Sequence, residues 1–101
     1  MAQFDVYINE NLITNNRVPF LVDVQNDILK SLNTRVVIPL ARNLKDVQGL
    51  TKEFIINDEK LYLISSQIGA VHINELQQKV TSLENQKDEI KNSLDFLIYG
   101  F

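Results

Sequence analysis

Residues 18–41 read VPFLVDVQNDILKSLNTRVVIPLA and contain two segments that favour β-strands. Residues 18–25 and 35–41 are rich in Val, Ile, Leu and Phe, which suit a half-buried or buried strand. Residues 26–34 separate them and contain Asn, Asp, Ser and Thr, which favour turns. The pattern predicts two strands joined by an irregular connection.

Three features inside these residues refine the prediction. Proline donates no backbone hydrogen bond, so we expect Pro19 at a strand start or on an edge. For the same reason Pro39 should end its ladder or mark a bulge. Ile28 and Leu29 form an adjacent apolar pair within the polar break.

Further strands are expected on both sides. Residues 4–8 alternate between apolar and polar positions, as a half-buried strand does. Residues 54–56 and 60–65 flank Asn-Asp-Glu and predict a hairpin, and residues 67–72 predict one more short strand. Two polar segments are interpreted as loops: residues 9–17, which carry the apolar side chains of Leu12 and Ile13, and residues 42–53, with one helical turn at 43–47.

The C-terminal quarter has a helical pattern. Its seam repeats at spacings of four and three through Leu76, Val80, Leu83, Lys87, Ile90, Leu94, Leu97 and Phe101. Thr81 and Glu84 fit a capping box, so the helix begins either near residue 75 or at residue 82. A short coiled coil is an alternative, but the preceding strands favour packing across a sheet or a dimer.

The chain ends on Tyr99-Gly100-Phe101, where most small domains have a polar tail. These two aromatic side chains either fold back onto the protein's own core or serve as anchors for another protein. We therefore predict an α+β fold in one domain, residues 1–101, with a strongly bent sheet or small barrel and a long C-terminal helix.

Composition narrows the function. The 101 residues carry a net charge of −3, which argues against direct binding of nucleic acid. The chain has no cysteine, so it has no disulfide and no thiolate metal site. It shows no signal-peptide pattern and no apolar run long enough to cross a bilayer, and the simplest interpretation is a soluble cytoplasmic protein that does not contact a membrane.

The sequence offers little catalytic chemistry. His72 is the single histidine, and one histidine among scattered acidic residues does not indicate a metal site. The three glycines form no phosphate-binding loop, and Ser65-Ser66 lacks the context of a catalytic nucleophile. We expect neither an enzyme nor a cofactor.

Residues 20–28, FLVDVQNDI, resemble a phrase carried by the CcdB toxin family. Residues 35–41 and residues 88–101 are similar to two further phrases of that family, in the same order. The resemblance runs nearly end to end and is weakest across the loops at 9–17 and 42–53. It implies an SH3-like bent β-barrel of about five antiparallel strands with a small additional sheet and a long C-terminal helix.

The resemblance also implies a function. CcdB toxins are homodimers that bind the A subunit of DNA gyrase and trap it on cleaved DNA, and the antitoxin CcdA removes them. The family's gyrase-facing residues match Ile28, Leu29, Asp95, Ile98, Tyr99, Gly100 and Phe101. Its antitoxin surface includes the two loops, in which we expect contacts from Leu12, Ile13, Asn43, Leu44 and Asp46.

Several of these positions depart from the family. Asp95 replaces an asparagine, Ile98 a phenylalanine, Tyr99 a tryptophan and Phe101 an isoleucine, while Gly100 is kept. A homologue that still binds antitoxin but no longer acts on gyrase is therefore one alternative. The other is a MazF-like ribonuclease on the same fold, for which Arg17, Arg35 and His72 are the candidate catalytic residues.

Overall fold

The computed structural model describes residues 1–42 and 51–100. Its strands are β1 (Asp5–Ile8), β2 (Phe20–Asp23), β3 (Thr34–Ala41), β4 (Thr51–Ile56), β5 (Glu59–Ile64), β6 (Gly69–His72) and β7 (Lys79–Ser82). One α-helix, α1 (Lys87–Tyr99), follows the last strand. Within the described residues, three 3₁₀ helices lie between strands, η1 (Asp27–Leu29), η2 (Ser65–Gln67) and η3 (Ile73–Glu75), and a fourth, η4 (Glu84–Gln86), lies between β7 and α1.

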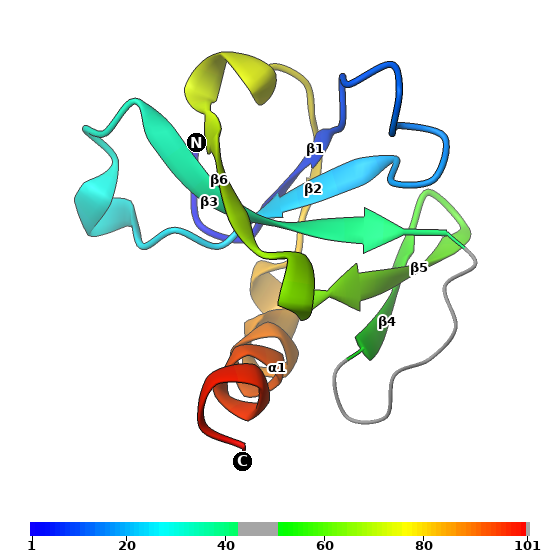
Figure 1. The fold of residues 1–101 in the computed structure, drawn as a ribbon, viewed down its shortest axis with the longest axis vertical. Coiled ribbons are helices and arrows are strands. Elements are labelled where there is room, and N and C mark those ends of the chain that lie inside the picture. The colour runs from blue at the N-terminus through cyan, green and yellow to red at the C-terminus, as the bar shows by residue number, and fades with distance from the viewer. Residues whose placement is uncertain (43–50, 101) are drawn as a thin grey trace.

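All the strand pairings are antiparallel, and the strands form one curled sheet in the order β4-β5-β3-β2-β1-β7, with β6 paired to β3. Figure 1 shows the sheet curling over itself, with α1 below it. This half-barrel with a C-terminal helix confirms the predicted α+β class.

Pro19 directly precedes β2, at the strand start where a proline was expected, but Pro39 does not end its strand. It lies within β3, opposite Leu21 of β2. On the other edge of β3, β6 pairs as far as Val37 and β5 pairs from Leu40 onward. The missing N–H of Pro39 therefore falls where β3 changes neighbours on that edge, and a central strand tolerates it there.

The hairpin is confirmed, although β4 is longer than expected. It begins at Thr51, inside the segment interpreted as a loop, and the helical turn expected at 43–47 lies outside the described residues. Ile56 pairs with Glu59 across a two-residue turn in which Asn57 and Asp58 have φ angles of 52° and 64°. Positive φ at both positions is the geometry that twisted hairpins favour, and Asn and Asp adopt it more readily than most residues.

Of the two predicted helix starts, the one near residue 75 is wrong, because residues 76–83 are not helical, whereas the later start near residue 82 is close to the observed one. Residues 79–82 form β7, which pairs with the outer edge of β1, and the Leu83 N–H donates to the Phe4 carbonyl at 2.8 Å. The apolar spacing was misleading because Leu76 and Leu83, on either side of β7, are buried without being part of a helix. Backbone pairing with β1 decided between the two, a contact far away in sequence.

The proposed capping box is also absent. The residue before η4 is Leu83, whose side chain makes no capping hydrogen bond. The Glu84 N–H donates to the hydroxyl of Ser82 and not to that of Thr81. Helix α1 then begins at Lys87 with Asp88 and Glu89 in its first turn, where negative charge suits the helix dipole.

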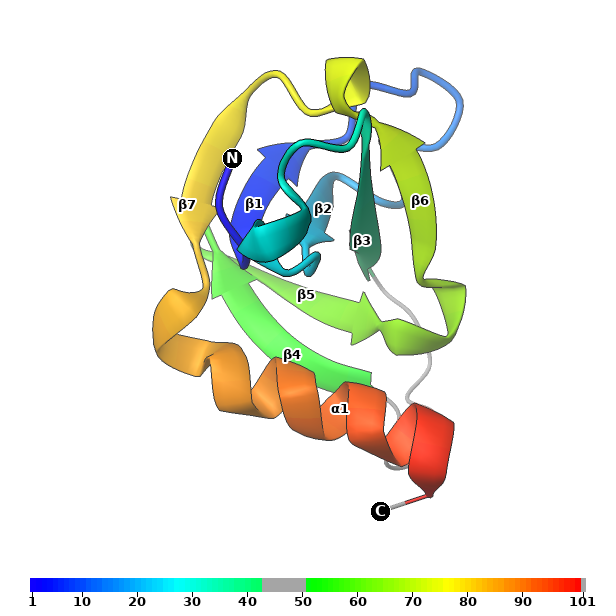
Figure 2. The ribbon, with the colours of Figure 1, turned by 90° about the vertical axis from the view of Figure 1, so that its left-hand side faces the viewer.

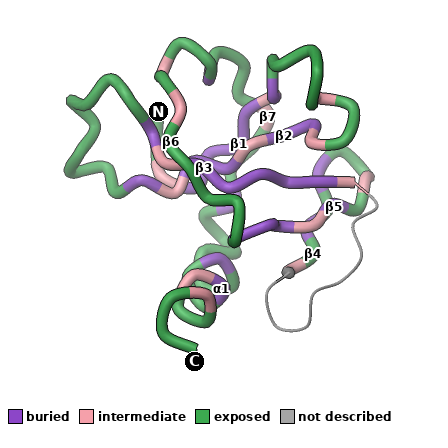
Figure 3. Tube along the Cα trace, viewed as in Figure 1, coloured by how far each residue is buried: buried purple, intermediate pink, exposed green. Residues whose placement is uncertain are grey.

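The main core lies between the curled sheet and α1. It includes Val22, Ile38, Phe54, Leu61 and Leu63 from the sheet, Phe4 just before β1, and Ile90 from the helix. Figure 3 shows buried residues running along the central strands, whereas the C-terminal end of α1 is exposed. The helix packs against β4 and η2, and the Ser93 hydroxyl hydrogen-bonds to the Ser65 hydroxyl of η2.

A smaller cluster of Tyr7, Val37 and Leu76 is buried on the other face of the sheet. The Tyr7 hydroxyl donates to the Asp5 carboxylate at 3.5 Å. Burial raises the pKa of the Tyr7 phenol from 10.0 to about 12, and the negative charge of Asp5 adds to the shift.

This shift predicts a loss of stability in alkali. The unfolded chain releases the phenol proton at lower pH than the folded protein, so stability falls as pH rises above about 10. At a pH of about 11 the loss relative to neutral pH should be about 1.4 kcal/mol, measured by denaturant unfolding. The Tyr7→Phe variant should lack this part of the pH dependence, and an unchanged alkaline profile in that variant would contradict the assignment.

Candidate protein-binding site

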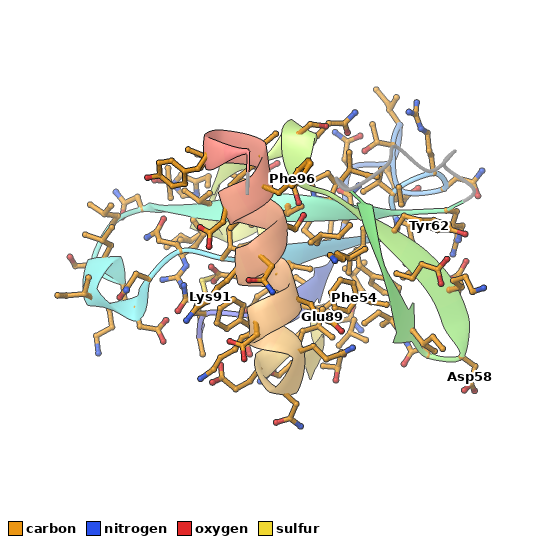
Figure 4. The ribbon with its side chains drawn as sticks, turned by 90° about the horizontal axis from the view of Figure 1, so that it is seen from below. Phe54, Asp58, Tyr62, Glu89, Lys91 and Phe96 are labelled. Atoms are coloured by element: carbon orange, nitrogen blue, oxygen red, sulfur yellow. The ribbon has the colours of Figure 1, made fainter. Side chains whose placement is uncertain are left out.

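The C-terminal end of α1 presents apolar side chains to solvent. Ile98 is 65% exposed and Tyr99 67% exposed, so the tail does not fold back onto the protein's own core. Phe96 is exposed as well, and Figure 4 shows it at this end of the helix. Asp95 is exposed on the same last turns, and Phe101 lies outside the described residues.

Gly100 ends the helix. Its φ of 81° is left-handed, and its N–H donates to the Phe96 carbonyl at 2.9 Å. A glycine adopts this backbone without steric cost, which is why it commonly follows the last helical turn. The position of Tyr99 is thus set by α1 up to its final residue.

A second apolar surface is formed by η1. Ile28 is 84% exposed, Leu29 is about half exposed, and Leu32 just beyond them is also exposed. In Figure 2, η1 and the length of α1 are both seen from one side of the molecule, η1 above and the helix below. The structure therefore displays the apolar pair that the sequence placed in a polar break.

Buried polar groups lie directly beneath η1. Arg35 is fully buried, and its Nε donates to the Asp23 Oδ2 at 2.7 Å. Its Nη2 donates to the Gln25 carbonyl at 3.2 Å and to the Asp27 Oδ1 at 3.4 Å. Asp23, Gln25 and Arg35, which lie in the segments that resemble the family, thus form a buried framework that supports η1.

Burial and pairing act in opposite directions on the charges in this framework. Burial raises the pKa of the Asp23 carboxyl above its usual range, and the hydrogen bonds from Arg35 and Gln25 oppose that shift. Burial also disfavours the Arg35 cation, but its bonds to Asp23 and Asp27 outweigh this and leave the pKa of Arg35 raised.

A third apolar surface is the loop at residues 9–17, where Leu12 is 88% exposed and Ile13 92% exposed. Asparagine side chains shape this loop: Asn9 Nδ2 donates to the Val18 carbonyl at 2.8 Å, and Asn11 Oδ1 accepts the Ile13 N–H at 2.9 Å. Because polar side chains hold the turn internally, Leu12 and Ile13 project outward. Asn43, Leu44 and Asp46, expected beside them, lie outside the described residues.

A cleft of about 210 Å³ opens next to this loop. Asn9, Glu10, Asn11 and Leu21 line one part of it, and Asn74 and Glu75 of η3 line the other. Its walls combine one apolar side chain with amides and two carboxylates, a surface suited to a polar or cationic segment of another chain.

Two of the three residues considered for a ribonuclease, Arg35 and His72, have structural roles. The Arg35 guanidinium is buried in its ion pair. The His72 Nδ1 accepts the Asn74 N–H at 3.1 Å and caps η3, a structural role. Within residues 1–42 and 51–100, no group of three or more His, Asp or Glu side chains is placed to hold a metal ion. In the same residues, every helix is too short or too polar to cross a membrane.

Sequence reasoning missed two parts of the site. Phe96 and Leu32 extend the exposed apolar surfaces, and no periodicity argument distinguished them from core positions. In the sequence, Asp23, Gln25 and Arg35 appear only as polar residues inside or next to apolar strands. This placement indicates buried polar groups, which need hydrogen-bond partners.

A comparison with protein families agrees with this arrangement: the model of the CcdB protein family matches residues 3–100. The match covers nearly the whole sequence, including the three exposed apolar surfaces and the buried framework. The chain belongs to the CcdB protein family, whose members are toxins of toxin–antitoxin systems that poison DNA gyrase without catalysing a reaction.

Proposed function

We propose that this chain is the toxin of a type II toxin–antitoxin system that binds the A subunit of DNA gyrase and traps the enzyme on cleaved DNA. The observation that carries the proposal is the exposed apolar end of α1, formed by Ile98 and Tyr99. An aromatic side chain on a rigid element is a typical interface anchor, because it contributes a large apolar area with little loss of rotamer entropy. Ile28 and Leu29 of η1 supply a second part of the proposed gyrase surface.

The proposed mechanism needs no chemical step. In a homodimer, the twofold axis would present two copies of the helix end, and gyrase has its own twofold axis through its A subunits. Trapping then requires only that the toxin bind the open, DNA-cleaved state more tightly than the closed state. The site of action is the cytoplasm, where gyrase works.

Departures from the family bear on affinity for gyrase. A phenol at position 99 stacks on cationic groups less strongly than an indole does. The carboxylate of Asp95 requires a basic partner on gyrase, since burying it unpaired would weaken the complex. A larger side chain at Phe101 needs a roomier pocket than isoleucine does. These changes suit a gyrase whose surface differs correspondingly.

The antitoxin surface proposed here uses the two segments that the sequence analysis assigned to it, residues 9–17 and 42–53. It comprises Leu12 and Ile13 with Asn43, Leu44 and Asp46, and the neighbouring cleft adds the carboxylates of Glu10 and Glu75. A disordered CcdA-like segment that folds on binding can cover such a spread-out surface.

The test uses purified gyrase, supercoiled DNA and the full-length chain. We expect accumulation of cleaved DNA that depends on the toxin and disappears when a CcdA-like peptide is added. Binding of the peptide without cleavage would instead identify a homologue that has lost its action on gyrase. Specific cleavage of RNA in the absence of metal would favour the ribonuclease alternative.

A further inference from the structure

The 3₁₀ helix η1 has no buried side chain, yet it holds Ile28 and Leu29 in one defined position. Short segments are ordinarily held in place by burying apolar side chains, and here those side chains face solvent. Polar contacts to the rest of the protein must therefore hold η1.

The start of η1 is held by side chains around it. The Asn26 Oδ1 accepts the Ile28 N–H at 2.9 Å and caps the 3₁₀ helix. The Asp27 Oδ1 accepts the Gln3 N–H at 2.9 Å and also faces Arg35. These contacts fix where η1 begins.

The end of η1 is joined to the sheet by Gln25. Its Nε2 donates to the Leu29 carbonyl at 3.0 Å, and its Oε1 accepts the Val36 N–H of β3 at 3.1 Å. Arg35 braces the Gln25 backbone through the carbonyl oxygen. Gln25 itself is only 6% exposed, so it is not available for direct contact with a partner.

We propose that Gln25 is a positioning residue for gyrase binding, because it holds η1 so that Ile28 and Leu29 form a preorganised apolar anchor. The inference rests on the proposed function and adds a residue that acts without touching gyrase. Preorganisation raises affinity by removing the cost of ordering the anchor when the complex forms.

The main test replaces Gln25 with leucine, which removes both side-chain hydrogen bonds, and measures binding of the full-length protein to the gyrase A subunit. We expect binding about tenfold weaker, together with faster hydrogen exchange of the backbone amides at residues 26–32. Gln77→Leu is the matched control. The Gln77 amide also donates to a backbone carbonyl, that of Asn74 at 2.8 Å, but it lies at η3, and its loss should leave gyrase binding unchanged.

Gln25→Glu is a second variant, in case the leucine variant does not fold. The carboxylate keeps an acceptor for the Val36 N–H but cannot donate to the Leu29 carbonyl. We expect it to loosen residues 26–32 and to weaken gyrase binding in the same direction as Gln25→Leu.

Ile28→Ala separates this inference from the proposed function. If Ile28→Ala leaves binding unchanged, η1 is not part of the gyrase surface, and both proposals for this element fail. If Ile28→Ala weakens binding but Gln25→Leu does not, only the positioning role of Gln25 is wrong.

A double variant distinguishes positioning from general destabilisation. If Gln25 acts through η1, Gln25→Leu combined with Ile28→Ala should bind little more weakly than Ile28→Ala alone. Fully additive losses, or unchanged hydrogen exchange at residues 26–32, would overturn the proposal.

Discussion

Replacing Tyr99 with alanine should weaken binding to the gyrase A subunit about a hundredfold and abolish trapping of cleaved DNA. An exposed aromatic side chain at the end of a rigid helix has the properties of an interface hot spot, where truncation typically costs about 2 kcal/mol or more. Deletion of Phe101 should have the same direction of effect. Calorimetric binding to the A subunit and a DNA-cleavage assay with purified gyrase measure the two consequences.

Ile55→Ala is the matched control for Tyr99→Ala. Ile55 is 69% exposed on β4, and its hairpin ends at Asp58, far from the C-terminal end of α1 (Figure 4). We expect Ile55→Ala to leave trapping intact, and we expect both variants to unfold at about the temperature of the unaltered protein. Normal trapping by Tyr99→Ala would show that the helix end is not the gyrase anchor.

Replacing Arg35 with methionine should lower the free energy of unfolding by about 3–5 kcal/mol. The substitution leaves the fully buried Asp23 carboxylate without its cation and removes the brace on the Gln25 carbonyl. A loss of this size is a large fraction of the stability of a small domain, so the variant should unfold at much lower denaturant concentration. Chemical denaturation followed by circular dichroism measures the effect.

Two comparisons test the cause of that loss. Arg42 pairs with Glu59 at a partly exposed site, and Arg42→Met should cost much less stability than Arg35→Met because water solvates the remaining carboxylate. The double variant Asp23→Asn, Arg35→Met removes both buried charges and should recover part of the loss. If Arg35→Met is no more harmful than Arg42→Met, the buried pair does not have the structural importance assigned to it.

Local patterns predicted much of the fold correctly. The alternation at residues 4–8, the β-rich segment at 35–41 and the polar turn before Glu59 each became part of a strand or hairpin close to the expected place. These elements depend on side-chain burial at a period of two and on turn chemistry, both of which are properties of neighbouring residues. The helix was predicted correctly only from residue 84 onward, where Ile90 and Leu94 pack on the sheet.

The candidate site was predicted in part. The sequence offered Ile28 and Leu29 as an apolar pair in a polar break, and it left open whether the aromatic end of the chain is buried or exposed. The structure places Ile28, Leu29 and Tyr99 on the surface. The exposure of Phe96 was not predicted, because a helical repeat does not show where along the helix the sheet stops covering it. Arg35 was considered as a catalytic cation, yet the fold buries it against Asp23.

The sequence by itself determined the β-rich body and the polar break that carries an apolar pair, but it left open whether the aromatic side chains at the C-terminal end are buried or exposed. The two determined features follow from which side chains suit burial, turns or solvent at each position. Only the tertiary structure decided that residues 79–82 form a strand, because the open edge of β1 requires backbone hydrogen bonds. It also decided that Asp23, Gln25 and Arg35 form the support of η1, because buried polar groups need partners and only the folded chain brings theirs within reach.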